Sequence, residues 1–162
     1  MKKINIAIVG STGNVGREIL KILVERKFPF GKIELLASEK SVGKKINFQK
    51  KKSIEVKHLE GFNFKGVDLV FSSAGASVSK NFVPIALDKG SVVIDNTSAF
   101  RLEKNVPLVV PEVNSDALKN FKKNGIIANP NCSTIQMVTA LKPLHDELGI
   151  KRIVVSTYQS TS

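Results

Sequence analysis

The chain has 162 residues, of which 42% are hydrophobic and 24% charged, a composition that indicates a folded globular domain rather than a disordered chain. Its 25 basic and 14 acidic residues give a net charge of +11, but an aromatic content of 6% and the lack of a recognised nucleic-acid-binding motif argue against a DNA or RNA partner and favour anionic small molecules. No apolar run approaches the roughly 20 residues that cross a bilayer, and a chain with one cysteine, Cys132, cannot form an internal disulfide, so we expect a cytoplasmic protein without membrane attachment.

Short apolar runs alternate with stretches of helical periodicity along the chain. In chain order, the pattern predicts a strand at 4–9, a helix at 15–27, strands at 33–37 and 67–71, a helix at 77–89, a strand at 91–94, a short helix at 115–123, a strand at 126–128, a helix at 132–148 and a strand at 152–157. This alternation predicts an α/β fold with a doubly wound, mostly parallel sheet, the Rossmann-like NAD(P)-binding fold. The last strand, 152–157, is expected to leave an exposed sheet edge that promotes self-association.

A glycine-rich loop joins the first predicted strand to the first predicted helix. Residues 10–16 read Gly-Ser-Thr-Gly-Asn-Val-Gly, a G-x-x-G-x-x-G pattern. Glycine permits a tight turn and a close approach of backbone N–H groups to phosphate, and the helix N-terminus that follows adds positive potential. The strand–loop–helix context favours a dinucleotide-binding loop. A tight structural turn that binds no ligand is the alternative interpretation.

The segment after the second predicted strand bears on the choice of cofactor. NAD-binding domains place an acidic side chain there to bind the ribose 2′-hydroxyl. This chain has Ser38, Lys40 and Ser41, whose hydroxyl and ammonium groups suit a 2′-phosphate, although Glu39 would repel that phosphate if it pointed inward. We therefore expect NADP, with a solvent-exposed turn as the alternative interpretation of Lys40.

Cys132 occupies the start of the longest predicted helix, after Pro130 and Asn131 end a strand. A helix N-terminus favours the thiolate form of cysteine, and its N–H groups can stabilise an oxyanion. Cys132 is therefore a candidate nucleophile, with an inert buried cysteine as the alternative. Neither histidine is an evident base. His145 follows thirteen residues later on the same predicted helix, about 20 Å away, and His58 lies in a lysine-rich region outside any motif.

Several segments of the chain resemble those of one family, the aspartate-semialdehyde dehydrogenases. They are the glycine loop, LAS at 36–38, FSSAG at 71–75, VIDNTSAFR at 93–101, VPLVVPEVN at 106–114, NPNCSTIQ at 129–136 and VSTYQ at 155–159. The glycine loop is common to many folds, whereas DNTSAFR, VPEVN and NCSTIQ together are highly specific. The resemblance implies that NADPH reduces β-aspartyl phosphate to aspartate semialdehyde and phosphate, in the route to lysine, threonine and methionine.

The resemblance also implies roles for individual residues. Cys132 matches the nucleophile that forms an acyl-thioester, and Asn131 matches a residue that positions the substrate or its oxyanion. Arg101 matches the arginine that holds the substrate phosphate, and Gln159 the glutamine that orients the substrate. The residues that match the cofactor site are Gly10, Thr12, Gly13, Asn14 and Val15 in the phosphate loop, Ser38, Lys40 and Ser41 at the 2′-phosphate, and Ser73, Ala74 and Gly75 beside the dinucleotide. No metal ligand is implied.

The chain departs from the family pattern next to the expected 2′-phosphate. Lys40 stands where the family commonly has arginine, and a lysine binds phosphate as a point charge without a bidentate fork. Glu39 stands where a small neutral residue is frequent.

The resemblance sets an expected domain organisation as well. Residues 1–157 are expected to form a dinucleotide-binding domain, and 158–162 to begin the connection to a catalytic and dimerisation domain that carries the acid/base histidine. The chain alone is then expected to bind NADP without turnover, and the whole enzyme to be a homodimer or homotetramer that acts on a small-molecule substrate. Two alternatives are N-acetyl-γ-glutamyl-phosphate reductase, whose motif is normally Gly-Cys-Tyr where this chain has Asn131-Cys132-Ser133, and a non-catalytic dinucleotide-binding module.

Overall fold

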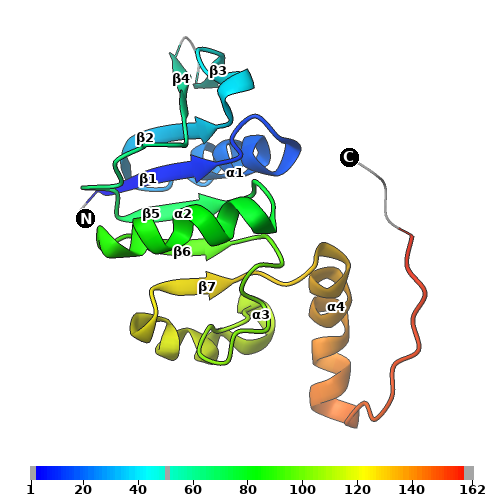
Figure 1. Ribbon diagram of the computed structural model, residues 1–162. Coiled ribbons are helices and arrows are strands. Elements are labelled where there is room, and N and C mark those ends of the chain that lie inside the picture. Colours follow the sequence, from blue (N-terminus) through cyan, green and yellow to red (C-terminus); the bar gives the residue numbers. More distant parts are fainter. Residues whose placement is uncertain (1–2, 50–51, 159–162) are drawn as a thin grey trace.

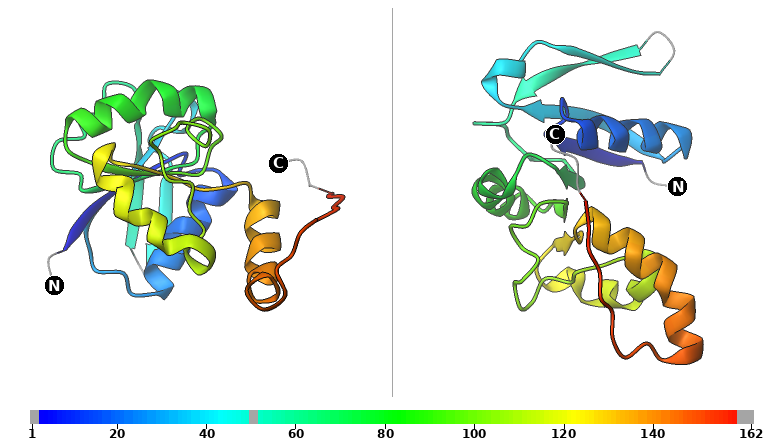
Figure 2. Two further views of the ribbon diagram at one scale, coloured as in Figure 1. Left: turned by 90° about the horizontal axis from the view of Figure 1, so that it is seen from below. Right: turned by 90° about the vertical axis from the view of Figure 1, so that its right-hand side faces the viewer.

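Seven strands form one sheet in the described part of the chain, residues 3–49 and 52–158 of the computed structural model (Figure 1). In chain order the elements are β1 (Ile4–Val9), α1 (Asn14–Glu25), β2 (Phe30–Ala37), η1 (Glu39–Ser41), β3 (Lys45–Gln49), β4 (Lys52–His58), β5 (Leu69–Ser72), α2 (Ala76–Asp88), β6 (Val92–Asp95), α3 (Pro111–Asn114), η2 (Ser115–Lys123), β7 (Ile126–Ala128) and α4 (Cys132–Leu148). Figure 2 shows α1 and α2 on opposite faces of the sheet and α4 beyond it. Among the described helices, none is long and apolar enough to span a membrane.

The strand order is β3-β4-β2-β1-β5-β6-β7, and every neighbouring pair is parallel except β3 and β4. The chain builds the sheet outward from β1 through β2 and β4, returns to the other side of β1, and continues through β5, β6 and β7. This confirms the predicted doubly wound, Rossmann-like fold, with an antiparallel edge strand added. The order reverses between β1 and β5, and such sheets bind ligands outside the carboxyl ends of the strands at this point.

The side chains of β1 alternate between the two helical layers. Ile6 and Ile8 belong to a buried cluster with Leu20 and Leu23 of α1, and Ala7 and Val9 belong to a second buried cluster with Phe82 and Val83 of α2. A strand that is buried on both faces has a nearly continuous apolar sequence. The run INIAIV therefore predicts β1 from the sequence alone.

The lysine-rich segment after β2 folds into a hairpin of β3 and β4, two strands that the sequence analysis did not predict. Ile46 and Phe48 in β3 and Ile54 and Val56 in β4 alternate with polar residues and pack into the cluster that contains α1. Such alternation gives a strand with one buried face. Lysines fill many of the exposed positions, so the alternation of apolar and polar residues is hard to recognise in the sequence. Residues 50–51, between the two strands, lie outside the described part of the chain.

The strand predicted at 152–157 is wrong, because this segment runs beside α4 without joining the sheet (Figures 1 and 2). The free edge of β7 is occupied instead by the segment before α3. Val109 N donates to Ala128 O at 3.0 Å, and Ala128 N donates to Pro107 O at 2.9 Å. The β-branched side chains of 153–155 are largely exposed. Residues 152–157 therefore do not form the exposed, self-associating sheet edge that was expected.

Glu34 is a buried carboxylate of β2 that lies between two lysines. Its side chain contacts Lys57 Nζ at 2.7 Å and also contacts Lys32 Nζ. Burial raises the pKa of Glu34, but the hydrogen bonds from Lys32 and Lys57 together outweigh burial and hold this pKa below its ordinary value of 4.5. The two lysines are mostly exposed, so water screens part of the attraction.

Glu34→Gln is expected to lower the free energy of unfolding by about 1 kcal/mol at pH 7, because glutamine keeps the shape but lacks the negative charge and one of the two acceptor oxygens that the lysines contact. The pKa of Glu34 is lower in the folded chain than its ordinary 4.5, so this stability is present above pH 4.5 and is lost as the pH falls through the folded-state pKa. Urea unfolding at pH 7 and near pH 3 measures the effect. If the wild type and Glu34→Gln differ in free energy of unfolding by the same amount at both pH values, the assigned role of the Glu34 charge is wrong.

Candidate active site

Among the described residues, those predicted to bind cofactor and substrate follow the carboxyl ends of the parallel strands, at one edge of the sheet (Figure 1). The segments are 10–16 after β1, 38–41 after β2, 73–75 after β5, 96–101 after β6 and 129–132 after β7. Neighbouring strands lie about 4.8 Å apart, so β2 and β7, four strands apart in the sheet order, are separated by about 19 Å. The predicted cofactor residues therefore lie toward one side of this edge, and Cys132 lies at the other.

The glycine loop is folded tightly against itself and against the loop after β5. A Cβ on Gly16 would lie 2.4 Å from Gly10 O and 2.8 Å from Ser11 Cα, so a larger residue cannot fit without a backbone shift. Gly10 has a φ of 80°, a left-handed conformation that suits glycine, and a Cβ on it would lie 2.9 Å from Ser73. Gly16 thus lets the glycine loop close on itself, and Gly10 lets the loops after β1 and β5 meet where the strand order reverses.

The start of α1 lies directly behind this loop. Gly13 is its N-cap and has no side chain to cap the helix, while Asn14 and Val15 are exposed and Thr12 is half-buried. The first N–H groups of a helix have no acceptor within the helix and carry positive potential. A Cβ on Gly13 would meet only Gly10 O, at 3.4 Å, so the space in front of this helix end is open. This cradle fits the pyrophosphate of a dinucleotide.

The segment after β2 contacts the glycine loop. The Oγ1 of Thr12 and the Oγ of Ser41 are 3.4 Å apart, and Ser41 is buried. Ser38, Glu39 and Lys40 are exposed. The structure thus brings Thr12 and Ser41 together and leaves the two charged side chains between Ser38 and Ser41 in solvent.

On the other side of β1, Ser73 and Gly75 lead into α2. The Ser73 hydroxyl donates to Val9 O at 2.9 Å, which joins the ends of β1 and β5. Gly75 is the N-cap of α2 with a φ of 94°, and Ala74 between them is half-buried. The N-terminus of α2 therefore lies at the same sheet edge as the N-terminus of α1.

Arg101 is held by backbone carbonyls of the loops after β6 and β7. Its Nε donates to Asn129 O and its Nη2 to Asn96 O, both at 2.9 Å. The amide of Asn129 also donates to Asn96 Oδ1, so the two loops are tied to each other. These bonds use two of the five N–H donors of a guanidinium, which leaves the fixed group able to bind an anion.

Cys132 is the first residue of α4 and is exposed. Asn131 is the N-cap of this helix, and its side-chain oxygen accepts a hydrogen bond from Ser133 N at 3.0 Å. The position of the cysteine at the N-terminus of a 17-residue helix agrees with the sequence analysis, and its exposure contradicts the alternative of a buried cysteine. Helix N–H groups beside a thiol suit attack on a carbonyl carbon.

Neither histidine lies close to Cys132. His145 is on the last turn of α4, thirteen residues and about 20 Å along the helix. His58 ends β4, which is five strands from β7 and therefore about 24 Å away. Within the described residues there is no group of His, Cys, Asp and Glu that could hold a metal ion. Gln159 lies outside the described residues.

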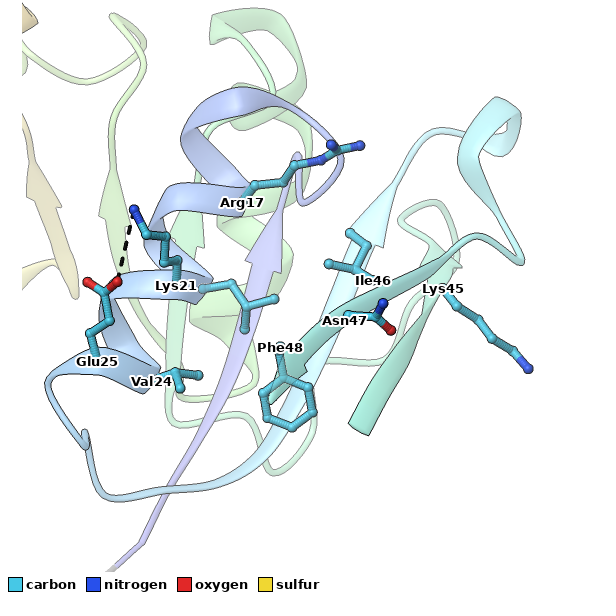
Figure 3. A pocket seen from close by; sticks show the side chains of 9 residues that line it. Arg17, Lys21, Val24, Glu25, Lys45, Ile46, Asn47 and Phe48 are labelled. Carbon is cyan, nitrogen blue, oxygen red and sulfur yellow. Dashed lines mark ion pairs between the residues drawn. The ribbon is translucent and has the colours of Figure 1, made fainter. Parts of the chain in front are cut away.

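A cavity of about 560 Å³ lies between α1 and β3, away from the predicted site residues (Figure 3). Val24, Ile46 and Phe48 give it apolar walls, and Arg17 and Lys45 lie at its rim. None of the described residues that were predicted to bind cofactor or substrate lines this cavity. It is a consequence of how the β3–β4 hairpin packs against α1.

The sequence analysis missed the two asparagines that hold Arg101. Asn96 directly follows β6, and Asn129 directly follows β7. Polar residues at the carboxyl ends of parallel strands face the ligand side of such sheets, so their position was an available signal. The contact between Arg101 and Asn129 was not available, because these two residues lie 28 positions apart in the chain.

Residues 5–121 match the family described as semialdehyde dehydrogenase, NAD binding domain. The chain therefore belongs to the semialdehyde dehydrogenase family and contains its NAD-binding domain. The strand order, the glycine loop and the helix N-termini at one sheet edge agree with this assignment.

The names of individual relatives are more specific than that of the family. The aspartate-semialdehyde dehydrogenase of Aquifex aeolicus is 59% identical over 158 residues, which cover 97% of this chain and 46% of that protein. The crystal structure of aspartate semialdehyde dehydrogenase II from Vibrio cholerae complexed with ASA is 49% identical, with a TM-score of 0.89 over 93% of this chain and 49% of that one. An aspartate semialdehyde dehydrogenase with NADP from Candida albicans is 28% identical, with a TM-score of 0.72 over 92% and 48% of the two chains. The chain spans about half the length of the curated relatives it matches.

Proposed function

We propose that this chain is the cofactor-binding and nucleophile-bearing part of an aspartate-semialdehyde dehydrogenase. Such an enzyme reduces β-aspartyl phosphate with NADPH to aspartate semialdehyde and phosphate, in lysine, threonine and methionine biosynthesis. The observation that carries the proposal is the order of groups along the sheet edge. The 2′-phosphate segment, the glycine loop, Arg101 and Cys132 follow β2, β1, β6 and β7, in that spatial order. The identity to the Aquifex aeolicus enzyme over nearly the whole chain supports it.

Cys132 and Arg101 act on different groups of the substrate, the acyl carbon and the phosphate. The Cys132 sulfur attacks the acyl carbon and forms a thioester, and phosphate leaves with the electron pair of the broken C–O bond. The N–H groups at the start of α4, together with Asn131, stabilise the negative charge that develops on the carbonyl oxygen. Arg101 binds the phosphate group through the donors that its carbonyl contacts leave available. Gln159 orients the substrate.

NADP fits the residues after β1, β2 and β5. The N–H groups around Gly13 bind the pyrophosphate, Ser38, Lys40 and Ser41 bind the 2′-phosphate, and 73–75 adjoin the dinucleotide on the other side of β1. When bound, NADPH supplies the hydride for the reduction. The Candida albicans relative, solved with NADP, supports this choice of cofactor.

The catalytic groups are divided between this chain and the rest of the enzyme. We assign residues 1–157 to the dinucleotide-binding domain and 158–162 to the start of the connection to a catalytic and dimerisation domain. The distance of both described histidines from Cys132 supports this division, because the chemistry needs a positioned acid–base group. The enzyme is then a cytoplasmic homodimer or homotetramer with a small-molecule substrate.

Residues 1–162 are expected to bind NADPH at least about tenfold more tightly than NADH, a preference of about 1.4 kcal/mol, because the 2′-phosphate adds contacts to Ser38, Lys40 and Ser41. Calorimetric titration with each nucleotide measures both affinities. Lys40→Ala should weaken binding of NADPH and leave binding of NADH unchanged. Lys44→Ala, which removes an exposed lysine outside this segment, should affect neither. Equal affinities for the two nucleotides would contradict the assignment of NADP.

The full-length enzyme that carries this chain should reduce NADP when aspartate semialdehyde and phosphate are supplied, and residues 1–162 alone should not. Turnover by residues 1–162 alone would show that the acid–base group lies within them. An inactive full-length enzyme would contradict the proposed reaction.

A further inference from the structure

Asp95, the last residue of β6, is a carboxyl group with no exposed surface. Its Oδ1 accepts a hydrogen bond from Ser79 Oγ at 3.0 Å, and its Oδ2 accepts one from Thr97 Oγ1 at 2.8 Å. The Oγ atoms of Ser72 and Ser79 are 2.6 Å apart. Ser79 gives its single hydroxyl hydrogen to Asp95, so Ser72 is the donor in that pair. The hydroxyls of Ser79 and Thr97 therefore donate to the Asp95 carboxyl group, and that of Ser72 donates to Ser79. We call Ser72, Ser79, Asp95 and Thr97 the Asp95 cluster.

Thr97 connects the Asp95 cluster to the loop that carries Arg101. Its Oγ1 also accepts a hydrogen bond from Ala99 N at 3.1 Å, which fixes the turn two residues before Arg101. The backbone oxygen of Asp95 accepts from Asn129 N at 2.8 Å, and Asn129 O in turn accepts from Arg101 Nε. Asp95 thus holds both loops that contact the guanidinium, one through its side chain and one through its backbone.

We propose that Asp95, acting through Thr97, is a positioning residue that fixes the Arg101 guanidinium for an anionic group of the substrate. The inference rests on the proposed function, in which that group is the phosphate. Cys132 follows Asn129 by three residues, so the backbone contact of Asp95 also fixes the start of the segment that leads to the nucleophile.

The polar character of the Asp95 cluster supports a role in geometry rather than in net stability. A buried carboxyl group is costly unless it is hydrogen-bonded, and apolar residues of similar volume often give equal or greater stability. Directional hydrogen bonds, in contrast, define a single arrangement of the groups they join. The arrangement defined here is that of the loop from Asn96 to Arg101.

Thr97→Val tests the connection, because valine keeps the volume of threonine and lacks the hydroxyl that joins Asp95 to Ala99. In residues 1–162 labelled with ¹⁵N, the Nε–H of Arg101 should exchange with solvent at least about tenfold faster in this variant, because its bond to Asn129 O opens more often. The chain has four arginines, and Arg101→Lys identifies the signal. Thr97→Ser, which restores the hydroxyl, should return the exchange rate to that of the wild type.

Ser91→Ala is the matched control. Ser91 is 3% exposed, and its hydroxyl donates to Val67 O at 2.7 Å at the opposite end of β6 from the Asp95 cluster. Both substitutions remove a buried hydroxyl and should lower the midpoint of urea unfolding, but only Thr97→Val should change the exchange of the Arg101 Nε–H. If the exchange rate of the Arg101 Nε–H is unchanged in Thr97→Val, or rises equally in Thr97→Val and Ser91→Ala, the Asp95 cluster contributes to stability alone and the proposal is overturned.

Steady-state kinetics of the full-length enzyme give a second test. Thr97→Val should raise the KM for phosphate about tenfold and change the KM for NADP and kcat by less than about twofold. An unchanged KM for phosphate would also overturn the positioning role. An inactive wild-type enzyme would instead contradict the proposed function, and the exchange rates in residues 1–162 would still decide whether Asp95 positions Arg101.

Discussion

Turnover by the full-length enzyme is expected to fall at least about 10³-fold when Cys132 is replaced by serine. Serine is close to cysteine in size, but its hydroxyl is much less acidic than a thiol. At neutral pH the serine therefore stays protonated and is a far weaker nucleophile, even with the acid–base group that the rest of the enzyme is proposed to supply. Initial rates of NADP reduction, with aspartate semialdehyde and phosphate as substrates, measure the loss.

The fold and the cofactor site should remain intact in Cys132→Ser, since Cys132 is exposed and lies across the sheet edge from the glycine loop. NADPH affinity, measured by calorimetry, should equal that of the wild type. Thr139→Ala, an exposed substitution on the same helix, serves as the control for α4 and should keep full activity. Activity of Cys132→Ser within about tenfold of the wild type would remove Cys132 from the role of nucleophile.

Gly16→Ala is expected to lower the free energy of unfolding by about 3 kcal/mol, at the upper end of the usual cost of overpacking. The added methyl would lie 2.4 Å from Gly10 O and 2.8 Å from Ser11 Cα, and both atoms belong to the backbone of a tight loop. A backbone atom cannot move aside as the end of a long side chain can, so the loop must open. Urea unfolding followed by circular dichroism measures the change.

Gly13→Ala provides the contrast within the same loop. A methyl there would meet only Gly10 O, at 3.4 Å, and Gly13 has a φ of −75°, which alanine adopts readily. Stability should therefore change by less than about 1 kcal/mol. The affinity for NADPH should fall at least about tenfold, because the methyl stands in front of the N-terminus of α1, where the pyrophosphate is proposed to bind. Unchanged NADPH affinity in Gly13→Ala would place the pyrophosphate elsewhere. A stable Gly16→Ala would contradict the close packing of the loop.

The elements that the sequence predicts well are those whose burial is visible in local pattern. The run INIAIV is apolar because β1 is covered on both faces, and the spacing of Leu20 and Leu23 shows which side of α1 is buried. The segment 152–157 has the β-branched composition of a strand as well. The edge of β7 that it could have joined is taken by the segment around Leu108, which pairs with Ala128, and this pairing is not visible in the local sequence of either segment.

In the candidate site too, features that rest on local sequence were predicted and features that rest on contacts between distant residues were not. Motifs place the glycine loop, Arg101 and Cys132 at the ends of strands, and the parallel sheet then brings those ends to one edge. The contacts that fix Arg101 are different, because Asn129 is 28 residues away in the chain. Asp95 was likewise not singled out, because its partners are recognised only when Ser79 on α2 is seen to face the end of β6.

The spacing of the strands has an evolutionary consequence. The segment proposed to select between NADP and NAD follows β2, and the proposed nucleophile follows β7, four strands and about 19 Å away. Substitutions at sites this far apart, with no shared partners, usually have additive effects on free energy. Under the proposed assignment, Lys40 or Glu39 can therefore be exchanged for other residues, with a change in the preferred nucleotide and without a compensating change at Cys132 or Arg101.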